Sequence, residues 1–373
     1  MGVEKRLLRP AFLVGVLAVF LSAPAVLAQS TKDLPPPPPL WKAKPTPTPT
    51  PPEKEVIDVV RVTSNLVMVP VSVTDRDGQA IQGLTKTDFR LQEEGKQQEI
   101  AEIGDPEQVP LAIALLFDIS SSVSQKGFFA FQQQAAAAFL KQVMKPSDRA
   151  AIFTIATAPQ MVQTLSTAEV AAAKVVTIPP ATSSVATAFY DTVSAAAAYL
   201  ETAPSQYRRV IVVITDGDDN NSRRIVAVSQ AEAKASQNDQ LNASAARVGL
   251  QARHRAAVAD VQQAAQKADA IFYSVNPGGP SVKLNQIAMR AELGMEAIAE
   301  ATGGTAFIPD GEKDLERVFR QVAAELRGQY LLQYYGDSEA ARGQFRRIQV
   351  TVPTRADARV RARQGYYPKK QPD

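Results

Sequence analysis

The stretch that most constrains this chain is a short apolar run that ends in oxygen-bearing side chains. Residues 111–117 read Leu-Ala-Ile-Ala-Leu-Leu-Phe, and Asp118, Ser120 and Ser122 follow at once. An unbroken apolar run of this length is typical of a strand buried on both faces of a parallel sheet. Open α/β sheets carry their sites at the carboxyl ends of such strands. The sequence therefore predicts an α/β sheet with polar side chains at its rim.

The side chains of this loop are of the kind that hard cations bind. One carboxylate and two hydroxyls suit Mg²⁺ or Ca²⁺, but three ligands cannot enclose such an ion. Two other segments offer further oxygens, because the apolar run 210–214 leads to Asp216 and Thr187 precedes a helix-like segment. We therefore expect a divalent-metal site that consists of Asp118, Ser120, Ser122, Thr187 and Asp216.

A simpler interpretation of the loop is that it caps the helix that follows. Asp and Ser are common N-cap residues, so Asp118 and Ser120 could serve that purpose. Capping accounts for neither Thr187 nor Asp216, and we prefer the metal site for that reason.

The five positions resemble the metal-ion-dependent adhesion site (MIDAS) of the von Willebrand factor A domain. The motif of that family is Asp-x-Ser-x-Ser, then a Thr, then an Asp. The resemblance implies a bound Mg²⁺, or Ca²⁺ or Mn²⁺, with one carboxylate acting through water. Because only Asp118 and Asp216 are charged, the ion would keep positive charge and a replaceable water. Such a site would bind a partner protein that supplies an Asp or Glu.

Strands and helices alternate through the middle of the chain. This pattern predicts a doubly wound, mostly parallel sheet with helices on both faces. We expect this α/β domain to span residues 108–328. Its expected strands are 111–117, 150–157, 210–214, 270–275 and 305–308, and its expected helices are 128–143, 187–201 and 312–327.

Strand-like segments flank this domain on both sides. They are residues 67–73, 98–103, 330–335, 345–352 and 359–367. Neither side has enough strands for an independent sheet. We therefore expect one small β-sandwich-like module built from both chain ends, residues 53–107 and 329–369, with the α/β domain inserted in it. This arrangement resembles the VWFA-related family first noticed in Acidobacteria, whose function is poorly defined.

Residues 223–267 are longer than an ordinary crossover connection requires. They are rich in Ala and Gln, and seven Lys or Arg against three Asp or Glu give them a net charge of +4. This composition favours helix. We expect a long helix or helical hairpin packed beside the sheet; the alternative is a projecting basic arm that contacts a partner. His254 lies in this insert, and we expect it to be a solvated helix residue.

The first residues have the pattern of a secretory signal. Lys5, Arg6 and Arg9 precede an apolar stretch, and Val26-Leu27-Ala28 matches a signal-peptidase site. The apolar stretch is shorter than the ~20 residues of a membrane span. We expect residues 1–28 to be removed, which leaves a periplasmic or secreted protein without a transmembrane helix. An uncleaved anchor is the alternative.

A Pro-rich segment follows the leader at residues 29–52. Such a sequence predicts an extended, semi-rigid spacer. It could instead be a ligand for a Pro-recognition module.

Composition excludes several classes of function. The chain has no Cys, which excludes disulfides and thiolate metal sites. Its formal charge of +3 falls to +1 without the leader, so we expect no nucleic-acid partner.

We expect a binding protein, not an enzyme. His254 is the only histidine, and no Gly-x-Ser-x-Gly motif occurs, which removes the usual acyl-transfer machinery. One alternative is a Mg²⁺-dependent hydrolase that uses Asp118 with Asp218 or Asp219. Another is a structural envelope module that needs no metal.

Overall fold

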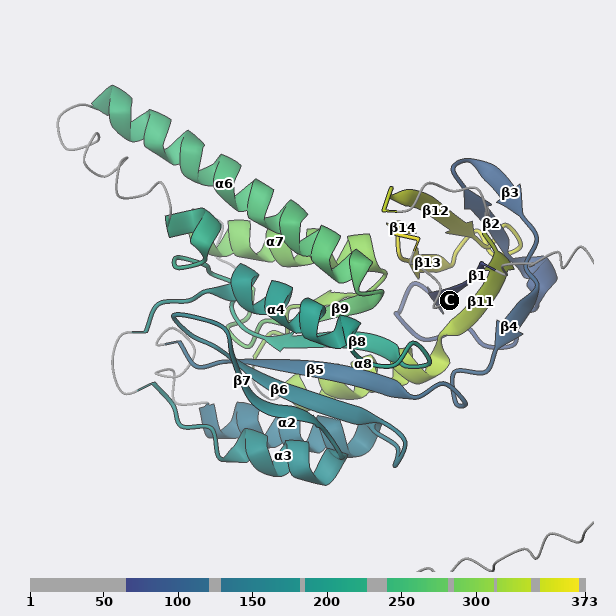
Figure 1. Cartoon of the computed structure of the whole chain (residues 1–373), viewed down its shortest axis with the longest axis horizontal. Coiled ribbons are helices and arrows are strands. Elements are labelled where there is room, and N and C mark those ends of the chain that lie inside the picture. Colours follow the sequence, from purple (N-terminus) through teal and green to yellow (C-terminus); the bar gives the residue numbers. More distant parts are fainter. Residues whose placement is uncertain are drawn as a thin grey trace, which may run out of the picture. The chain divides into compact units, whose positions relative to one another are not determined.

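A computed structural model describes residues 65–120, 129–181, 185–226, 240–280, 285–311, 314–336 and 343–368 (Figure 1). These residues belong to one compact unit, Arg61–Asp373. The expected leader, the Pro-rich segment and Ser122 lie outside the described residues. Within the described ranges, no helix has the length and apolar character that a bilayer crossing needs.

The α/β domain is built on a six-stranded sheet in the order β10-β9-β8-β5-β6-β7. All neighbours pair in parallel except β7, which runs antiparallel to β6 at the edge. The strands are β5 (Leu111–Asp118), β6 (Arg149–Ile155), β7 (Gln160–Ser166), β8 (Arg208–Ile214), β9 (Ala270–Val275) and β10 (Ala306–Phe307). The mostly parallel sheet predicted from the sequence is thereby confirmed.

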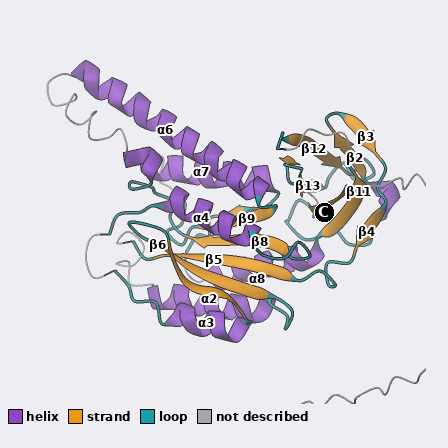
Figure 2. Cartoon of the chain, viewed as in Figure 1, coloured by secondary structure: helices purple, strands orange, loops and turns teal. Residues whose placement is uncertain are grey.

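Helices cover both faces of this sheet (Figures 1 and 2). One face carries α2 (Phe129–Val143), α3 (Ala168–Val176) and α8 (Leu315–Gly328), and the other carries α4 (Phe189–Glu201), α6 (Gln240–Lys267) and α7 (Gln286–Thr302). Burial on both faces of the sheet explains why residues 111–117 of strand β5 are all apolar. Leu115 and Phe117 pack on the first face and Ala114 and Leu116 on the second, and all four are fully buried.

Three elements of this domain were not expected from the sequence, namely β7, α3 and α7. Strand β7 lies at the edge and has no buried residue, so its polar residues gave no strand pattern. Helix α3 buries mainly Ala residues, and Ala and Gly make up four of the seven residues that α7 buries, so both helices carry a weak periodic signal.

The second module has two four-stranded antiparallel sheets, which combine strands from both sides of the α/β domain. Their orders are β13-β1-β11-β4 and β14-β12-β2-β3. The strands are β1 (Leu66–Thr74), β2 (Arg90–Glu93), β3 (Lys96–Gln98), β4 (Glu102–Gly104), β11 (Tyr330–Tyr335), β12 (Arg346–Thr351), β13 (Arg359–Ala362) and β14 (Gly365–Tyr366). A short 3-10 helix, Lys86–Asp88, begins with a Thr85–Asp88 capping box.

The inserted arrangement predicted from the sequence is confirmed by this pairing. Val69, Leu91 and Leu332 come from both halves and share one core. The predicted strand 98–103 was wrong in one respect, because β3 ends at Gln98 and β4 begins at Glu102 in the other sheet. The residue limits of the two modules stay predictions.

Buried polar contacts join the module to the α/β domain. Glu325 on α8 accepts hydrogen bonds from Ser72 Oγ on β1 and Tyr273 Oη on β9, each at 3.1 Å. Its carboxylate also pairs with Arg361 Nη2 on β13 at 2.9 Å. These contacts connect one helix of the domain to two strands of the module.

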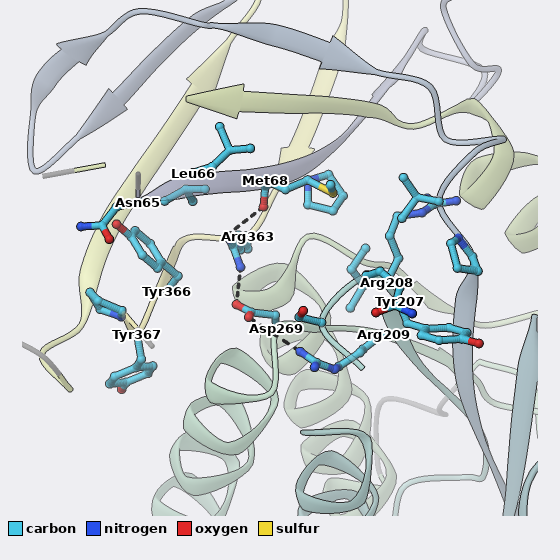
Figure 3. A pocket seen from close by; sticks show the side chains of 18 of the residues that line it. Asn65, Leu66, Met68, Tyr207, Arg208, Arg209, Asp269, Arg363, Tyr366 and Tyr367 are labelled. Atoms are coloured by element: carbon cyan, nitrogen blue, oxygen red, sulfur yellow. Dashed lines mark hydrogen bonds and ion pairs between the residues drawn. The ribbon is translucent and has the colours of Figure 1, made fainter. Parts of the chain in front are cut away.

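A second junction surrounds a cavity of about 480 Å³ (Figure 3). Arg363 of the module pairs with Asp269 and donates to the Met68 carbonyl at 2.9 Å. Asp269 also lies 3.9 Å from Arg209 of β8. The Asp269 carboxylate therefore lies between the guanidinium of Arg363 in the second module and that of Arg209 in the α/β domain.

Helix α6 accounts for most of the expected insert. Its second half buries Ala257, Val261 and Ala265, and it packs beside α4 and α7. The prediction of a long helix beside the sheet is thus right for this half. Figure 1 shows the first turns of α6 extending past α7. Residues 227–239 lie outside the described ranges, so the basic-arm alternative stays a prediction.

Candidate metal site

Four of the five predicted ligands lie at the carboxyl ends of neighbouring strands or just before α4. Asp118 is the last residue of β5, and Ser120 follows it; both are buried. Asp216 follows β8, the strand that pairs with β5. Thr187 is buried and lies two residues before α4. Ser122, the fifth, lies outside the described residues.

Asp118 is held in place by hydrogen bonds from Ser120 and Thr215. Its Oδ1 accepts from the Ser120 backbone N–H at 2.7 Å, and its Oδ2 accepts from Thr215 Oγ1 at 2.6 Å. Burial raises the pKa of Asp118 to about 6, and the charge of Asp216 adds to the increase. The hydrogen bonds from Thr215 and Ser120 oppose it. The carboxylate is therefore fixed in a place where its charge is poorly compensated.

Thr215 is a supporting residue that the sequence analysis missed. Its hydroxyl donates to Asp118 and accepts from the Gly217 N–H at 2.9 Å. Gly217 has a φ of +74°, and a Cβ there would lie 2.7 Å from Met295 Cε on α7. The turn after β8 thus favours glycine for its backbone angle, and the Met295 side chain would have to shift to admit a Cβ.

The loop before α4 is tied to the loop after β8. The Thr187 N–H donates to Asn220 Oδ1 at 2.9 Å. The Thr187 carbonyl accepts from the N–H groups of Asn220 and Asn221 at 3.1 and 3.0 Å. This two-way contact fixes Thr187 beside the Asp216 loop. No local sequence pattern predicts this contact, because it joins segments 33 positions apart.

Asp219 fastens the same two loops together. It is buried, and its carboxylate accepts from the Tyr190 N–H at 2.8 Å and from Ser222 Oγ at 2.6 Å. It also accepts from the N–H groups of Asn221 and Ser222. Asp219 was one of two carboxylates that a hydrolase could have used. Its oxygens are instead engaged in positioning the start of α4.

Asp218 brings a third carboxylate to the rim. Burial raises its pKa, as does the charge of Asp216, while Arg290 on α7 opposes the rise. The Arg290 guanidinium lies 3.7 Å from the Asp218 carboxylate. The charge of Asp216 thus disfavours the ionised forms of both Asp118 and Asp218.

This donor set fits a hard divalent cation. Among the described residues, no three His, Cys, Asp or Glu are grouped to hold a metal, so a cation here would rely on hydroxyls as well as carboxylates. Two carboxylates with neutral hydroxyl oxygens suit Mg²⁺, which keeps several waters of its own. A cation at this rim would offset the repulsion between Asp118 and Asp216.

The comparisons with known proteins give a domain assignment. Residues 113–218 match the von Willebrand factor type A domain, so this part of the chain is a domain of that type. No protein of curated function matches the chain.

Three solved structures are similar to the chain at low identity. The von Willebrand factor type A protein from Catenulispora acidiphila is 11% identical, with 82% of this chain and 75% of that one covered and a TM-score of 0.43. Proximal thread matrix protein 1 from the mussel byssus, with a zinc-occupied MIDAS motif, is 14% identical (61% and 48% covered, TM-score 0.40). The PilB minor pilin from Streptococcus sanguinis is 14% identical (59% and 62% covered, TM-score 0.43). The chain thus spans less than two thirds of the mussel and pilin chains.

Proposed function

We propose that the von Willebrand factor type A domain of this chain binds a divalent cation at the rim of its sheet and, through that cation, an acidic side chain of a partner protein. One observation carries the proposal. Of two neighbouring parallel strands, β5 ends in Asp118 and β8 leads to Asp216 two residues after its end, and Asp118 is fully buried beside the like charge of Asp216. Such an arrangement is costly without a cation, because burial and repulsion both disfavour the two charges.

The residues that would hold the ion are Asp118, Ser120, Ser122, Thr187 and Asp216. We propose Mg²⁺, with Ca²⁺ or Mn²⁺ as alternatives, because all five residues offer hard oxygen donors. The bound ion would supply positive charge that two carboxylates do not cancel when one of them acts through water. A partner carboxylate could then replace a water on the ion.

The expected setting of this function is outside the cytoplasm. The basic, apolar and small-residue succession at residues 1–28 supports export. The Pro-rich residues 29–52 would then hold the binding domain away from whatever the N-terminus meets. The absence of an acyl-transfer motif and the structural use of Asp219 support binding over hydrolysis.

Metal binding is tested first by calorimetric titration of Mg²⁺ into the mature chain. Asp216→Ala should abolish the binding heat, because it removes one of the two charged ligands. Asp310→Ala is the matched control, since Asp310 is an exposed aspartate shortly after β10 on the same sheet. Equal heats from the wild type and Asp216→Ala would contradict the metal site.

The open position on the ion is tested with Mn²⁺, whose bound water speeds the relaxation of solvent protons. An acetate titration should reduce this relaxation enhancement, because a carboxylate displaces the water. Acetamide is the matched control, because it has nearly the same shape and no charge. If the chain binds Mn²⁺ but acetate leaves the enhancement unchanged, the ion is structural and the adhesion function is wrong.

A further inference from the structure

A cavity of about 520 Å³ lies between α6 and α7, outside the proposed metal ligands. Val258 on α6 and Met289, Leu293 and Ala297 on α7 give it apolar walls. Met289 and Leu293 are 39% and 61% exposed, so its mouth is apolar too. The volume is within the range of sites for small organic ligands, about 300–1,000 Å³.

The imidazole of His254 forms part of the cavity lining. The sequence analysis predicted a solvated histidine, and this was wrong, because His254 is only 2% exposed. Small Ala side chains on α6 let this helix approach α4 and α7 closely. The close packing buries the polar His254 even though α6 has only a thin apolar stripe. Its Nδ1 lies 3.1 Å from the Tyr190 hydroxyl. Its Nε2 is buried and has no hydrogen-bond partner among the described residues.

The contact with Tyr190 indicates which nitrogen carries the proton. If the Tyr190 hydroxyl donates to Nδ1, only the Nε2–H group is left without a partner. If Nδ1–H donates instead, both the Tyr190 hydroxyl proton and the Nε2 lone pair lack partners. The first tautomer leaves fewer buried polar groups unsatisfied and is therefore favoured. His254 then presents a buried N–H donor that needs an acceptor.

Two arginines lie near this donor. Arg255 and Arg290 line the same cavity, and burial together with the charges of Arg290 and Arg253 lowers the pKa of His254 to about 4. The imidazole is therefore neutral at pH 7 and serves as a donor without adding charge. The Arg290 guanidinium is 3.7 Å from the Asp218 carboxylate, which is longer than a charge-assisted hydrogen bond of about 2.7–2.9 Å.

From these contacts we propose that the cavity between α6 and α7 binds a small organic acid, with its carboxylate at His254 Nε2 and Arg290 and its apolar body against Val258, Met289 and Leu293. The carboxylate satisfies the buried N–H group and takes a charge-assisted hydrogen bond from the guanidinium. The apolar body covers exposed side chains of α7. This site stands independently of the proposed metal function.

The test is calorimetric titration of sodium decanoate into the full mature chain in the presence of a chelator, below the concentration at which decanoate forms micelles. We expect one molecule to bind per chain. Decyltrimethylammonium, which has the same tail and the opposite charge, should not bind. Arg290→Gln should raise the Kd for decanoate about tenfold or more, since it removes a hydrogen bond to a charged group. His254→Phe should weaken binding in the same direction, because it removes the donor and keeps a flat ring.

Val248→Ser is the matched control for non-specific binding. Val248 is 63% exposed on α6 but does not line the cavity, so its substitution should leave the Kd unchanged. Each variant is first shown by circular dichroism to be folded. Equal affinity for decanoate and decyltrimethylammonium, or the same Kd for wild type and Arg290→Gln, would overturn the proposal. Chelator in every arm keeps a failure here distinct from a failure of metal binding.

Discussion

Replacement of Thr215 by Val tests whether its hydroxyl stabilises the proposed metal site, and it leaves every proposed ligand in the sequence unchanged. Val has nearly the shape of Thr but lacks the hydroxyl. That hydroxyl donates to Asp118 Oδ2 at 2.6 Å and accepts from the Gly217 N–H at 2.9 Å. Thr215 is fully buried, so water cannot replace either bond.

The magnitude follows from these two bonds. A hydrogen bond to a charged group contributes about 1.5–3 kcal/mol, and a buried N–H group that loses its acceptor costs about 1–3 kcal/mol. Because the turn at Gly217 can relax in part, we expect the free energy of unfolding to fall by about 3 kcal/mol in chelator. For a unit of this size, that corresponds to a decrease in Tm of roughly 6–12 °C. Mg²⁺ binding should also weaken, since Asp118 loses the group that orients it.

The assay is guanidinium unfolding, followed by circular dichroism, of the wild type, Thr215→Val and Thr215→Ser. The Ser variant keeps the hydroxyl and loses one methyl group, so it should lose only about 1 kcal/mol. The reasoning is refuted if Val is as stable as Ser, because the hydroxyl would then contribute nothing measurable.

Three further predictions concern the rest of the molecule. The pKa of His254 is lowered from 6.5 to about 4, so the unfolded state binds a proton at a higher pH than the folded state, and the free energy of unfolding falls as the pH decreases from about 6.5 to 4. Between pH 7 and pH 5, His254→Gln should lose about 2 kcal/mol less stability than the wild type, measured by guanidinium unfolding at both pH values. Glu325→Gln should lower the free energy of unfolding by about 3 kcal/mol, measured by calorimetric unfolding, because it leaves Arg361 without a counter-charge. The control is Glu316→Gln, an exposed glutamate of the same helix, which should change the free energy of unfolding by less than about 0.5 kcal/mol. Gly217→Ala should lower the Tm and weaken Mg²⁺ binding, because Ala at this position has an unfavourable φ of +74° and its Cβ contacts Met295. Thermal unfolding and calorimetry measure the two effects. Gly311→Ala is the control and should change neither, because a Cβ there meets nothing within 4 Å.

The strands that position the metal site could be predicted from the sequence because both of their faces are buried. An unbroken apolar run is then the expected pattern, as in residues 111–117 of β5 and residues 210–214 of β8. The polar residues at their ends were visible for the same reason, since they interrupt that pattern abruptly.

The supporting residues could not be predicted in this way, because their roles depend on contacts between distant segments. Thr215 acts on Asp118, which is 97 positions away, and Asn220 acts on Thr187, which is 33 positions away. No local pattern distinguishes these residues from ordinary loop residues. The burial of His254 was missed for a related reason, because it depends on how closely α4 and α7 approach α6.

The pairing of β4 with β11 has a mechanical consequence. The chain enters the α/β domain just after β4 and leaves it just before β11, and Gly104 and Leu331 are paired residues of these antiparallel strands. The domain is therefore attached to its module by two covalent links that start side by side in one sheet. A pull exerted by a partner at the rim would be divided between both links. Two parallel tethers also resist twisting, so the rim would keep its orientation under tension where a single linker would let it swivel.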